Sequence, residues 1–180
     1  MSITILKAGF QDLIQDLGRN GYTHMGISPT GAADNISFRI SNLLLGNDIN
    51  KPGIEITLFG GSYYFNKDAI IALSGSVFTS AIDGDIIPFF KPIVVKFGQT
   101  LSIGSTTNGA RCYLAIKGGF QVPYILNSSS THLLSNTGGF NGRNLKKNDE
   151  IICASSDDMG INNNIKFNID DDRSILRVTR

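Results

Sequence analysis

The chain carries little charge for its length. Asp, Glu, Lys and Arg make up 17% of its 180 residues, whereas about a quarter is usual in soluble proteins. The 16 basic and 15 acidic residues leave a net charge of +1, and no basic stripe is present to follow a phosphate backbone. We therefore expect no nucleic-acid partner, and we expect a surface that is polar but uncharged or buried against another protein.

Long hydrophobic runs are also missing. No stretch approaches the ~18 apolar residues that a membrane helix needs. Residues 1–7 lack the charged start and the apolar run of a signal peptide. The sequence therefore predicts a cytoplasmic protein with no membrane partner.

Cysteine and histidine are scarce. Cys112 and Cys153 lie in apolar runs, where free cysteine is commonly a small buried residue. A disulfide is not expected in the cytoplasm. Neither His24 nor His132 has a Cys or His neighbour at ligand spacing, so we predict no metal site.

Glycine, by contrast, is abundant at 20 residues, and Val, Ile, Phe and Thr recur in short runs between turn residues. Asp83-Gly84 is typical of a type I′ hairpin turn. Many short strands at close spacing predict a mainly β fold, either a sandwich or a closed barrel. The expected strands are 3–6, 53–59, 69–73, 77–82, 85–87, 93–97, 100–103, 111–116 and 150–154.

One short helix is predicted over about 35–45. Asp34 can cap its first turn, and Gly46 can end it. Four residues at i, i+4, i+7 and i+8 predict one apolar stripe along the helix. They are Ile36, Ile40, Leu43 and Leu44.

The domain organisation is expected to have three parts. Residues 1–154 form the β domain. Residues 155–172 are rich in Asn and Asp and are predicted to be a loop or linker. Residues 173–180 read as a strand that leads into a second half.

Three polar segments are candidates for chemistry. In the first, residues 15–22, Arg19 can hold a carboxylate or phosphate with two parallel hydrogen bonds, and Asp16 can bind a metal or act as a base. Gln15 adds an amide group. The alternative is an Asp16–Arg19 ion pair that only braces a loop.

The second segment, residues 26–34, leads into the helix. Helix N-termini attract anions, and the small residues Ser28 and Gly31 let a ligand approach the backbone. The alternative is an ordinary helix entry in which Asp34 is the cap.

The third segment joins residues 127–132 to residues 138–143. Its hydroxyl and glycine residues can line a polar pocket, to which Ser130, Thr131 and Arg143 would contribute. A solvated loop is the alternative. No Gly-x-Ser-x-Gly motif is present for a hydrolase triad.

The order of several motifs resembles the KipA family, also described as allophanate hydrolase subunit 2, as the C subunit of 5-oxoprolinase and as a biotin-dependent carboxyltransferase-like domain. The resemblance covers roughly residues 3 to 153. It is carried by Gln15-Asp16-Leu17-Gly18-Arg19, Gly31-Ala32 with Asp34, Asn42 with Leu44 and Gly46-Asn47, Glu55-Ile56-Thr57, Ala72-Leu73-Ser74-Gly75, Pro88, Pro92, Tyr113-Leu114-Ala115, Gly118-Gly119, and Leu126 to Thr131.

This resemblance implies a cyclophilin-like β-barrel in a protein about twice as long. It implies a KipI-type partner subunit and a LamB/YcsF-type third subunit. The implied activity is that of an ATP-dependent 5-oxoprolinase, which opens 5-oxoproline to glutamate and requires ATP with a divalent metal. The first alternative is a component of a biotin-dependent carboxyltransferase that acts on urea or a similar small amide.

Residue roles follow from the same resemblance. Arg19 would hold an anion, Asp16 would hold a metal or orient water, and Asp34 would cap the helix near the site. The chain departs from the family pattern at Ser129 and His132, which replace an arginine and an acid. That departure leaves open a regulatory binding protein or a truncated, non-catalytic remnant.

Overall fold

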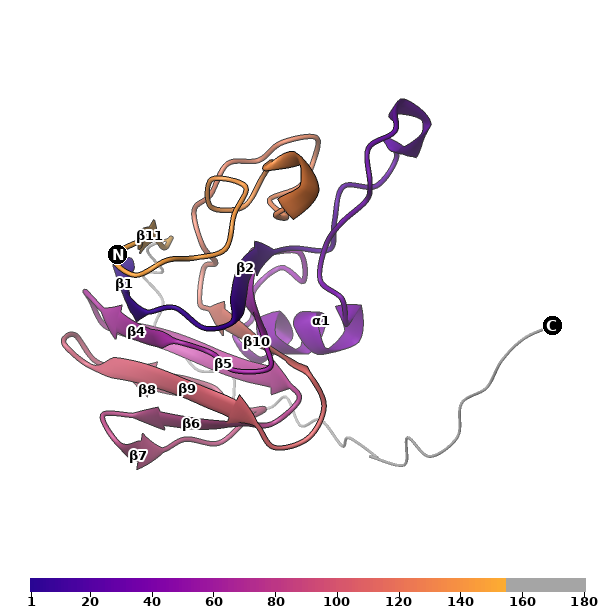
Figure 1. Cartoon of the computed structure of the whole chain (residues 1–180). Coiled ribbons are helices and arrows are strands. Elements are labelled where there is room, and N and C mark those ends of the chain that lie inside the picture. The colour runs from indigo at the N-terminus through magenta and orange to yellow at the C-terminus, as the bar shows by residue number, and fades with distance from the viewer. Residues whose placement is uncertain (155–180) are drawn as a thin grey trace.

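The computed structural model describes residues 1–154, which form two antiparallel β-sheets and one α-helix (Figure 1). The predicted mainly β fold with one short helix is thereby confirmed. The predicted linker 155–172 and the predicted strand 173–180 lie outside the described residues. Within residues 1–154, no helix is long and apolar enough to cross a membrane.

The first sheet has six strands and contains both ends of the described chain. The strands run, from edge to edge, β11 (Glu150–Ile152), β1 (Ser2–Lys7), β4 (Ser62–Phe65), β9 (Thr100–Thr106), β6 (Phe78–Ile82) and β7 (Asp85–Ile86). The predicted turn joins β6 to β7, and both of its residues, Asp83 and Gly84, have positive φ angles, as a type I′ turn requires.

The second sheet has five strands and supports the helix. Its order is β2 (Gln11–Gln15), β3 (Gly53–Thr57), β10 (Arg111–Ile116), β5 (Ala69–Gly75) and β8 (Ile93–Val95). Isolated bridges link the two sheets: Phe59, after β3, pairs with Ser105 of β9, and Phe120, after β10, pairs with Cys153, after β11.

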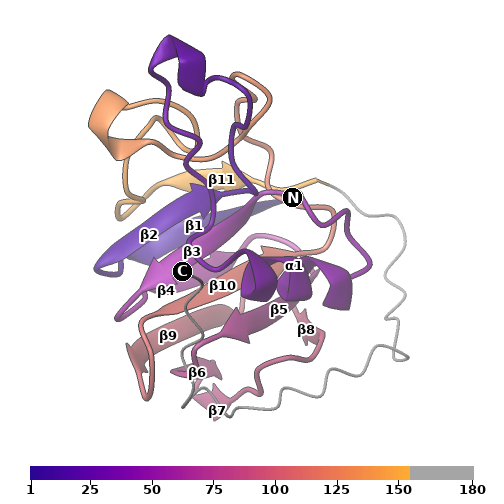
Figure 2. The ribbon, with the colours of Figure 1, turned by 90° about the vertical axis from the view of Figure 1, so that its right-hand side faces the viewer.

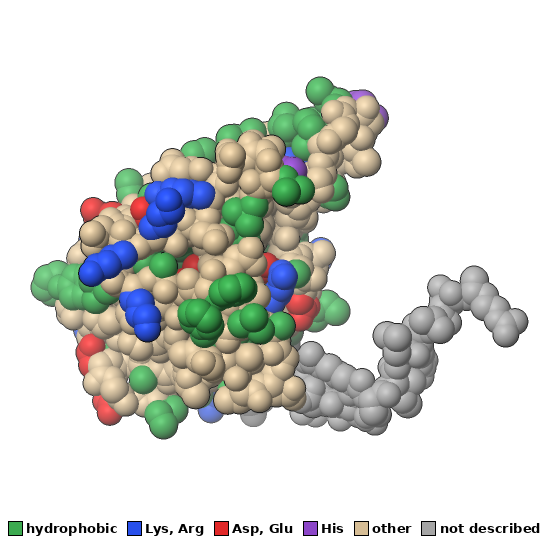
Figure 3. Space-filling model, viewed as in Figure 1, with side chains coloured by type: hydrophobic (Ala, Val, Ile, Leu, Met, Phe, Trp, Pro, Cys, Tyr) green, Lys and Arg blue, Asp and Glu red, His purple; other side chains and the backbone are tan. Residues whose placement is uncertain are grey.

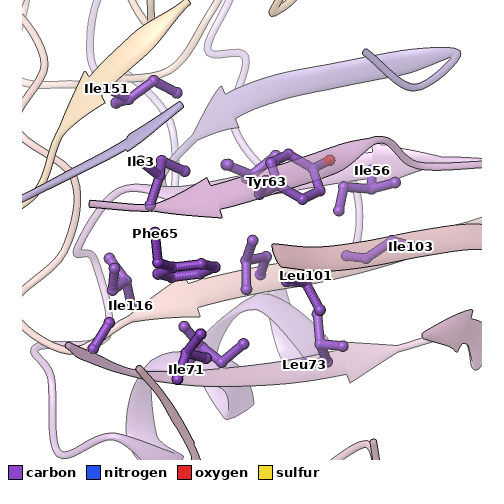
Figure 4. Packing of buried hydrophobic residues seen from close by; sticks show 14 of the residues in the cluster. Ile3, Ile56, Tyr63, Phe65, Ile71, Leu73, Leu101, Ile103, Ile116 and Ile151 are labelled. Carbon is purple, nitrogen blue, oxygen red and sulfur yellow. The ribbon is translucent and has the colours of Figure 1, made fainter. Parts of the chain in front are cut away.

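The core lies between the two sheets. Figure 4 shows Ile3, Phe65 and Leu101 of the first sheet facing Ile71 and Ile116 of the second. The inward side chains of both sheets are almost fully buried, which is the arrangement that aligned antiparallel sheets favour.

Helix α1 (Asn35–Leu44) covers the outer face of the second sheet, against β5 and β10 (Figure 2). Asp34 caps it as predicted, since its Oδ1 accepts from the amides of Ile36 and Ser37 at 3.1 and 3.0 Å. Gly46 follows the helix with φ 67°, as expected of a residue that ends a helix. Because α1 covers this sheet, β5 is buried on both faces.

The predicted apolar stripe of the helix is half correct, since Leu44 is 2% exposed and Ile40 packs against the same buried cluster. Ile36 is 73% exposed and Leu43 is 37% exposed. Besides Leu44, the buried face carries Phe38 and two serines, and the carbonyl of Ser37 accepts from Ser74 Oγ of β5 at 2.6 Å. The small serines let the helix lie close to the sheet, so the buried face is rotated relative to the predicted stripe and leaves Ile36 and Leu43 exposed.

Several strand assignments from the sequence need correction; for example, β8 ends at Val95 rather than at residue 97, and β9 continues to Thr106 rather than ending at residue 103. Strands β2 and β4 were not predicted, because β2 carries polar residues and β4 is only four residues long. Strand β3 ends at Thr57 rather than at residue 59, because Leu58 has a φ of 61° and leaves the extended conformation. All five residues of β3 are buried, since the segment leading into α1 covers its second face.

A buried acid lies inside the core. Asp12 Oδ2 accepts from Tyr63 Oη at 2.9 Å and from the Gly9 amide at 2.8 Å, while Oδ1 has no partner within the described residues. Burial raises the pKa of Asp12 above its usual range, although both hydrogen bonds oppose this shift.

We expect this acid to cost stability at neutral pH. Because the pKa of Asp12 is higher in the folded chain, the folded state prefers the protonated carboxyl. The resulting stabilisation is complete below about pH 4 and is lost as the pH rises through the folded pKa. The stability difference between Asp12→Asn and the parent should therefore favour the variant more at pH 7 than at pH 3. Urea unfolding at both pH values measures it, and a pH-independent difference would contradict the assignment.

Candidate functional site

Two loops rise above the sheets on one side of the molecule (Figures 1 and 2). We define the crown as residues 20–33, which carry the 3₁₀ turn η1 (Thr23–Met25), and residues 120–142, which carry η2 (Leu133–Ser135). The side chains of Tyr22 and Asn127 join the two loops by a 3.0 Å hydrogen bond. Below the crown, the end of β2 meets the residues that the sequence singled out.

Asp16 is 1% exposed and accepts hydrogen bonds on both carboxylate oxygens. Oδ1 accepts from Ser128 Oγ at 2.7 Å, from the Gly18 amide at 2.8 Å and from Ser130 Oγ. Oδ2 accepts from the amide of Ser129. A buried carboxylate needs such donors to compensate for its lost hydration, so Asp16 fixes the conformation of residues 128–130.

Arg19 is 2% exposed and connects the two crown loops. Its Nη1 donates to Thr30 Oγ1 at 2.8 Å, and its Nη2 donates to the Ser130 carbonyl at 2.6 Å. Gly138 lies against the same guanidinium with a φ of 72°, and a Cβ there would approach Nη2 to 2.6 Å. Arg19 Nε has no partner within the described residues.

Gln15 and Thr131 close the edge of the second sheet. The amide and the hydroxyl of Thr131 both donate to the Ile14 carbonyl, at 3.0 and 2.8 Å. Gln15 Nε2 donates to the Thr131 carbonyl at 3.4 Å. Strand β2 is an edge strand, and this segment satisfies backbone groups that would otherwise be open to pairing.

The structure therefore unites two segments that the sequence presented separately. Ser130 bridges them, because its hydroxyl donates to Asp16 and its carbonyl accepts from Arg19. The ion pair proposed between Asp16 and Arg19 is not formed within residues 1–154. Both side chains instead hold the crown loops, which is a positioning role, and their predicted catalytic roles stay predictions.

The remaining predicted site residues lie outside this cluster. Ser28 is exposed on the crown, and Asp34 caps the N-terminus of α1. Gly31 has a φ of 97° and packs against the backbone of Gly18. A Cβ at residue 31 would lie 2.8 Å from the Gly18 nitrogen. Arg143 makes two hydrogen bonds to Asp149, at 2.7 and 2.9 Å, and lies over the Phe140 ring.

A second buried network, which sequence reasoning missed, positions the entry to α1. Glu55 of β3 accepts from Arg111 Nη1 at 2.7 Å, from the Ala33 amide at 2.8 Å and from Tyr113 Oη at 3.0 Å. Tyr113 Oη in turn accepts from the Asp34 amide at 2.7 Å. Burial, followed by the Glu55 charge, raises the pKa of Tyr113. The network locks the crown-to-helix junction onto the sheet.

A cavity of about 630 Å³ opens beside the Asp16 cluster. We call it the Lys51 cavity after one of its lining residues. The ammonium of Lys51 forms no hydrogen bond or ion pair within residues 1–154 and is therefore available to a ligand. The cavity wall combines apolar rings with amide, carboxylate, hydroxyl and phenol groups. The lining residues are Asp16, Asp48, Asn50, Lys51, Pro52, Phe120, Gln121, Val122, Pro123, Tyr124 and Ser129.

Most of these lining residues were not predicted. Three of them follow the end of α1: Asp48, Asn50 and Lys51. The segment after Gly46 is rich in polar residues, and this composition could have marked it as a candidate site. Gln121 and Tyr124 carry no such signal, because only the path of the crown brings them to the cavity. Mixed apolar and polar walls of this kind suit a small ring or amide.

Comparison with known proteins decides the family. The family model described as "Carboxyltransferase domain, subdomain A and B" matches residues 25–179. This chain belongs to that carboxyltransferase family. The resemblance inferred from the sequence motifs is thereby confirmed at the level of the family.

Two curated relatives of this carboxyltransferase domain carry different names. Urea amidolyase of Saccharomyces cerevisiae is 45% identical over 158 residues, which are 87% of this chain and 9% of that protein. The C subunit of 5-oxoprolinase from Escherichia coli is 39% identical over 154 residues, which are 86% of this chain and 50% of that protein. The chain thus spans half, or less, of the length of these relatives.

Solved structures agree with the fold of the carboxyltransferase domain. The K. lactis urea amidolyase matches with a TM-score of 0.83 and 40% identity, covering 84% of this chain and 9% of that one. A crystal structure of TTHA0988 matches with a TM-score of 0.83 and 27% identity, covering 89% of this chain and 59% of that one.

The Asp16 cluster of the carboxyltransferase domain does not fit ATP or a divalent metal. Both oxygens of Asp16 are occupied by protein donors, and both terminal nitrogens of Arg19 donate to protein oxygens. Residues 1–154 contain no group of three His, Cys, Asp or Glu side chains that could hold a metal ion. A phosphate or metal would have to break this buried network, so we assign no ATP-dependent step to it.

Proposed function

We propose that the chain is a cytoplasmic component of an ATP-dependent 5-oxoprolinase, in which it binds the lactam that is opened to glutamate. The observation that carries this proposal is the 39% identity to the C subunit of 5-oxoprolinase over half of that protein. The Lys51 cavity supports it, because the walls combine apolar rings with groups that match both sides of an amide.

The residues of the Lys51 cavity recognise a small amide through its two polar sides. The Lys51 ammonium and the Tyr124 phenol donate toward the amide oxygen. The Asp48 carboxylate accepts from the amide N–H, and the ring packs on Phe120 and Val122. Since the Asp16 cluster does not accommodate ATP or its metal, these belong to other parts of the assembly in this proposal.

The crown supplies the surface for a KipI-type partner subunit. Residues 20–33 and 120–142 contain no Asp, Glu, Lys or Arg. Figure 3 shows mostly green and tan atoms over this raised part of the molecule. Exposed apolar side chains gather on it, including Met25 at 62%, Tyr124 at 64% and Leu134 at 93% exposure.

This composition matches the centre of protein interfaces, where charged residues are depleted and aromatic residues and Met are enriched. The partner surface must be apolar and uncharged as well, because a charge buried against the crown would find no counter-charge there. Tyr124 belongs both to the crown and to the Lys51 cavity, so a docked KipI-type protein would contribute to the same site. The proposed assembly also includes a LamB/YcsF-type protein as its third component.

A second candidate function is carboxyl transfer from biotin to urea. The 45% identity to urea amidolyase favours it. The apolar walls at Pro52, Phe120 and Pro123 suit the flat ring system of biotin, and the Asn50 and Gln121 amides suit its ureido group. Biotin, delivered by another domain, would supply the carboxyl group.

Reconstitution of the assembly separates these functions. The full-length protein is combined with its KipI-type and LamB/YcsF-type subunits and supplied with 5-oxoproline and ATP. We expect glutamate release that requires all components. Transfer from carboxybiotin to urea without glutamate release would favour the second candidate, and partner binding without either activity would assign a regulatory role.

Removal of the cavity cation should impair turnover. Lys51→Gln keeps a polar chain of similar size but removes the charge, so we expect kcat/KM for the amide to fall about tenfold or more. Lys147→Gln is the matched control, because Lys147 is exposed and does not line the cavity. Steady-state assays of both variants measure the effect, and equal activity would remove Lys51 from the site.

A further inference from the structure

A second cavity, of about 470 Å³, lies where α1 meets the base of the crown. We call it the Arg39 cavity. Four separate segments converge on it: the loop that follows β2, α1, the loop after α1, and the turn near residue 127. The lining residues are Leu17, Gly18, Asn20, Asn35, Arg39, Ile49, Asn50 and Asn127.

The charge that lines this cavity is positive. Arg39 is the only charged lining residue, and its guanidinium has no hydrogen bond or ion pair within residues 1–154. Asn35 lies one turn earlier on α1, and residues at i and i+4 share a helix face. The cavity therefore presents a free planar cation beside a carboxamide.

Two other amide side chains are held in place around this cation. Leu126 and Asn127 have φ angles of 51° and 58°, within a tight turn closed by the Ile125–Ser128 bridge. This left-handed conformation is costly for leucine, and it places Asn127 at the cavity. Asn50 is anchored by accepting from the Leu17 amide at 2.8 Å.

We propose that the Arg39 cavity binds a small oxyanion, either a carboxylate or a phosphate group. Arginine pairs with such groups through two parallel N–H donors, and carboxamide N–H groups add further donors. The absence of an acid in the lining leaves the positive charge of Arg39 uncompensated. The inference goes beyond the proposed function and stands on the cavity alone.

The two anion sources are distinguished by direct binding. The full-length protein is titrated calorimetrically with sodium 5-oxoproline in one arm and with inorganic phosphate in the other, while neutral urea serves as the uncharged comparison. We expect one of the anions to bind and urea binding to be independent of Arg39. The arm in which binding depends on Arg39 identifies the source of the oxyanion, because 5-oxoproline bound in the Lys51 cavity would not respond to Arg39→Gln.

Two variants test the site. Arg39→Gln removes the cation, and Asn35→Asp places a negative charge in the cavity without harming α1, since acids are favourable at helix N-termini. We expect each to weaken anion binding about tenfold or more. Lys91→Gln is the control, because it removes one exposed positive charge outside the cavity.

Three results would overturn the proposal. The first is that neither anion binds, and the second is that the parent, Arg39→Gln and Asn35→Asp bind the anion equally well. The third is that Lys91→Gln loses as much affinity as the cavity variants, which would indicate nonspecific attraction. Because the readout is binding, a failure of the reconstituted turnover assay would leave this proposal standing.

Discussion

Arg19→Ala should lower the free energy of unfolding by about 3 kcal/mol. The guanidinium is 2% exposed and donates to both crown loops. Its removal leaves the buried Ser130 carbonyl without a donor and opens a space next to Gly138. Urea unfolding measures the loss, and amide hydrogen exchange at residues 128–131 should rise with it.

Arg39→Ala is the matched control for this prediction. Arg39 is exposed and has no hydrogen bond or ion pair within residues 1–154, so its truncation should change stability by less than ~0.5 kcal/mol. Arg19→Lys should give an intermediate value, because a single ammonium cannot reproduce the fork that reaches both Thr30 and Ser130. Equal stability of the two alanine variants would show that Arg19 does not hold the crown.

Asp16→Asn should cost about 2–4 kcal/mol, because the carboxylate accepts from four donors. An amide of the same shape turns an N–H group toward one or more of those donors. Asp85→Asn is the control, since Asp85 is exposed on β7 and does not line the Lys51 cavity. Unchanged stability combined with lost turnover would instead identify Asp16 as a catalytic residue.

Local signals in the sequence predicted a large part of the fold. Strong β propensity marked most strands, and the Asp34 cap and Gly46 bounded α1 correctly because both act on their own helix ends. The buried face of α1 was predicted only in part, since Leu44 is buried as expected but close packing of Ser37 on Ser74 leaves Ile36 exposed. Strand β2 was missed because it carries polar residues whose partners are not evident locally: Asp12 accepts from Tyr63, and Gln15 donates to Thr131, more than a hundred residues away.

For the site, too, local sequence signals were predictive and long-range contacts were not. The sequence identified Asp16, Arg19, Ser130 and Thr131 as polar candidates, yet nothing local showed that Ser130 bridges the first two. The Lys51 cavity depends on long-range convergence of the loop after α1 with residues 120–124. Residue types therefore revealed chemistry, while the topology decided which groups meet.

Burial separates the residues of the site into those that position the crown and those that can meet a ligand. Asp16, Arg19 and Glu55 are buried and held by protein contacts, which suits them to position the crown. Lys51 and Tyr124 line an open cavity, which suits them to meet a ligand. This arrangement places ligand recognition next to the surface that we assign to the partner subunit.

The proposed docking of a partner through the crown can be tested with Leu134→Glu. Leu134 is 93% exposed on the crown, and Ile86 is 90% exposed on β7, outside it. Neither substitution should disturb the fold. The affinity of the full-length protein for the proposed KipI-type subunit is measured by titration. Leu134→Glu should weaken binding at least about tenfold, because it buries a charge in an uncharged interface, while Ile86→Glu should bind like the parent. Equal affinities for both variants would exclude the crown as the docking surface.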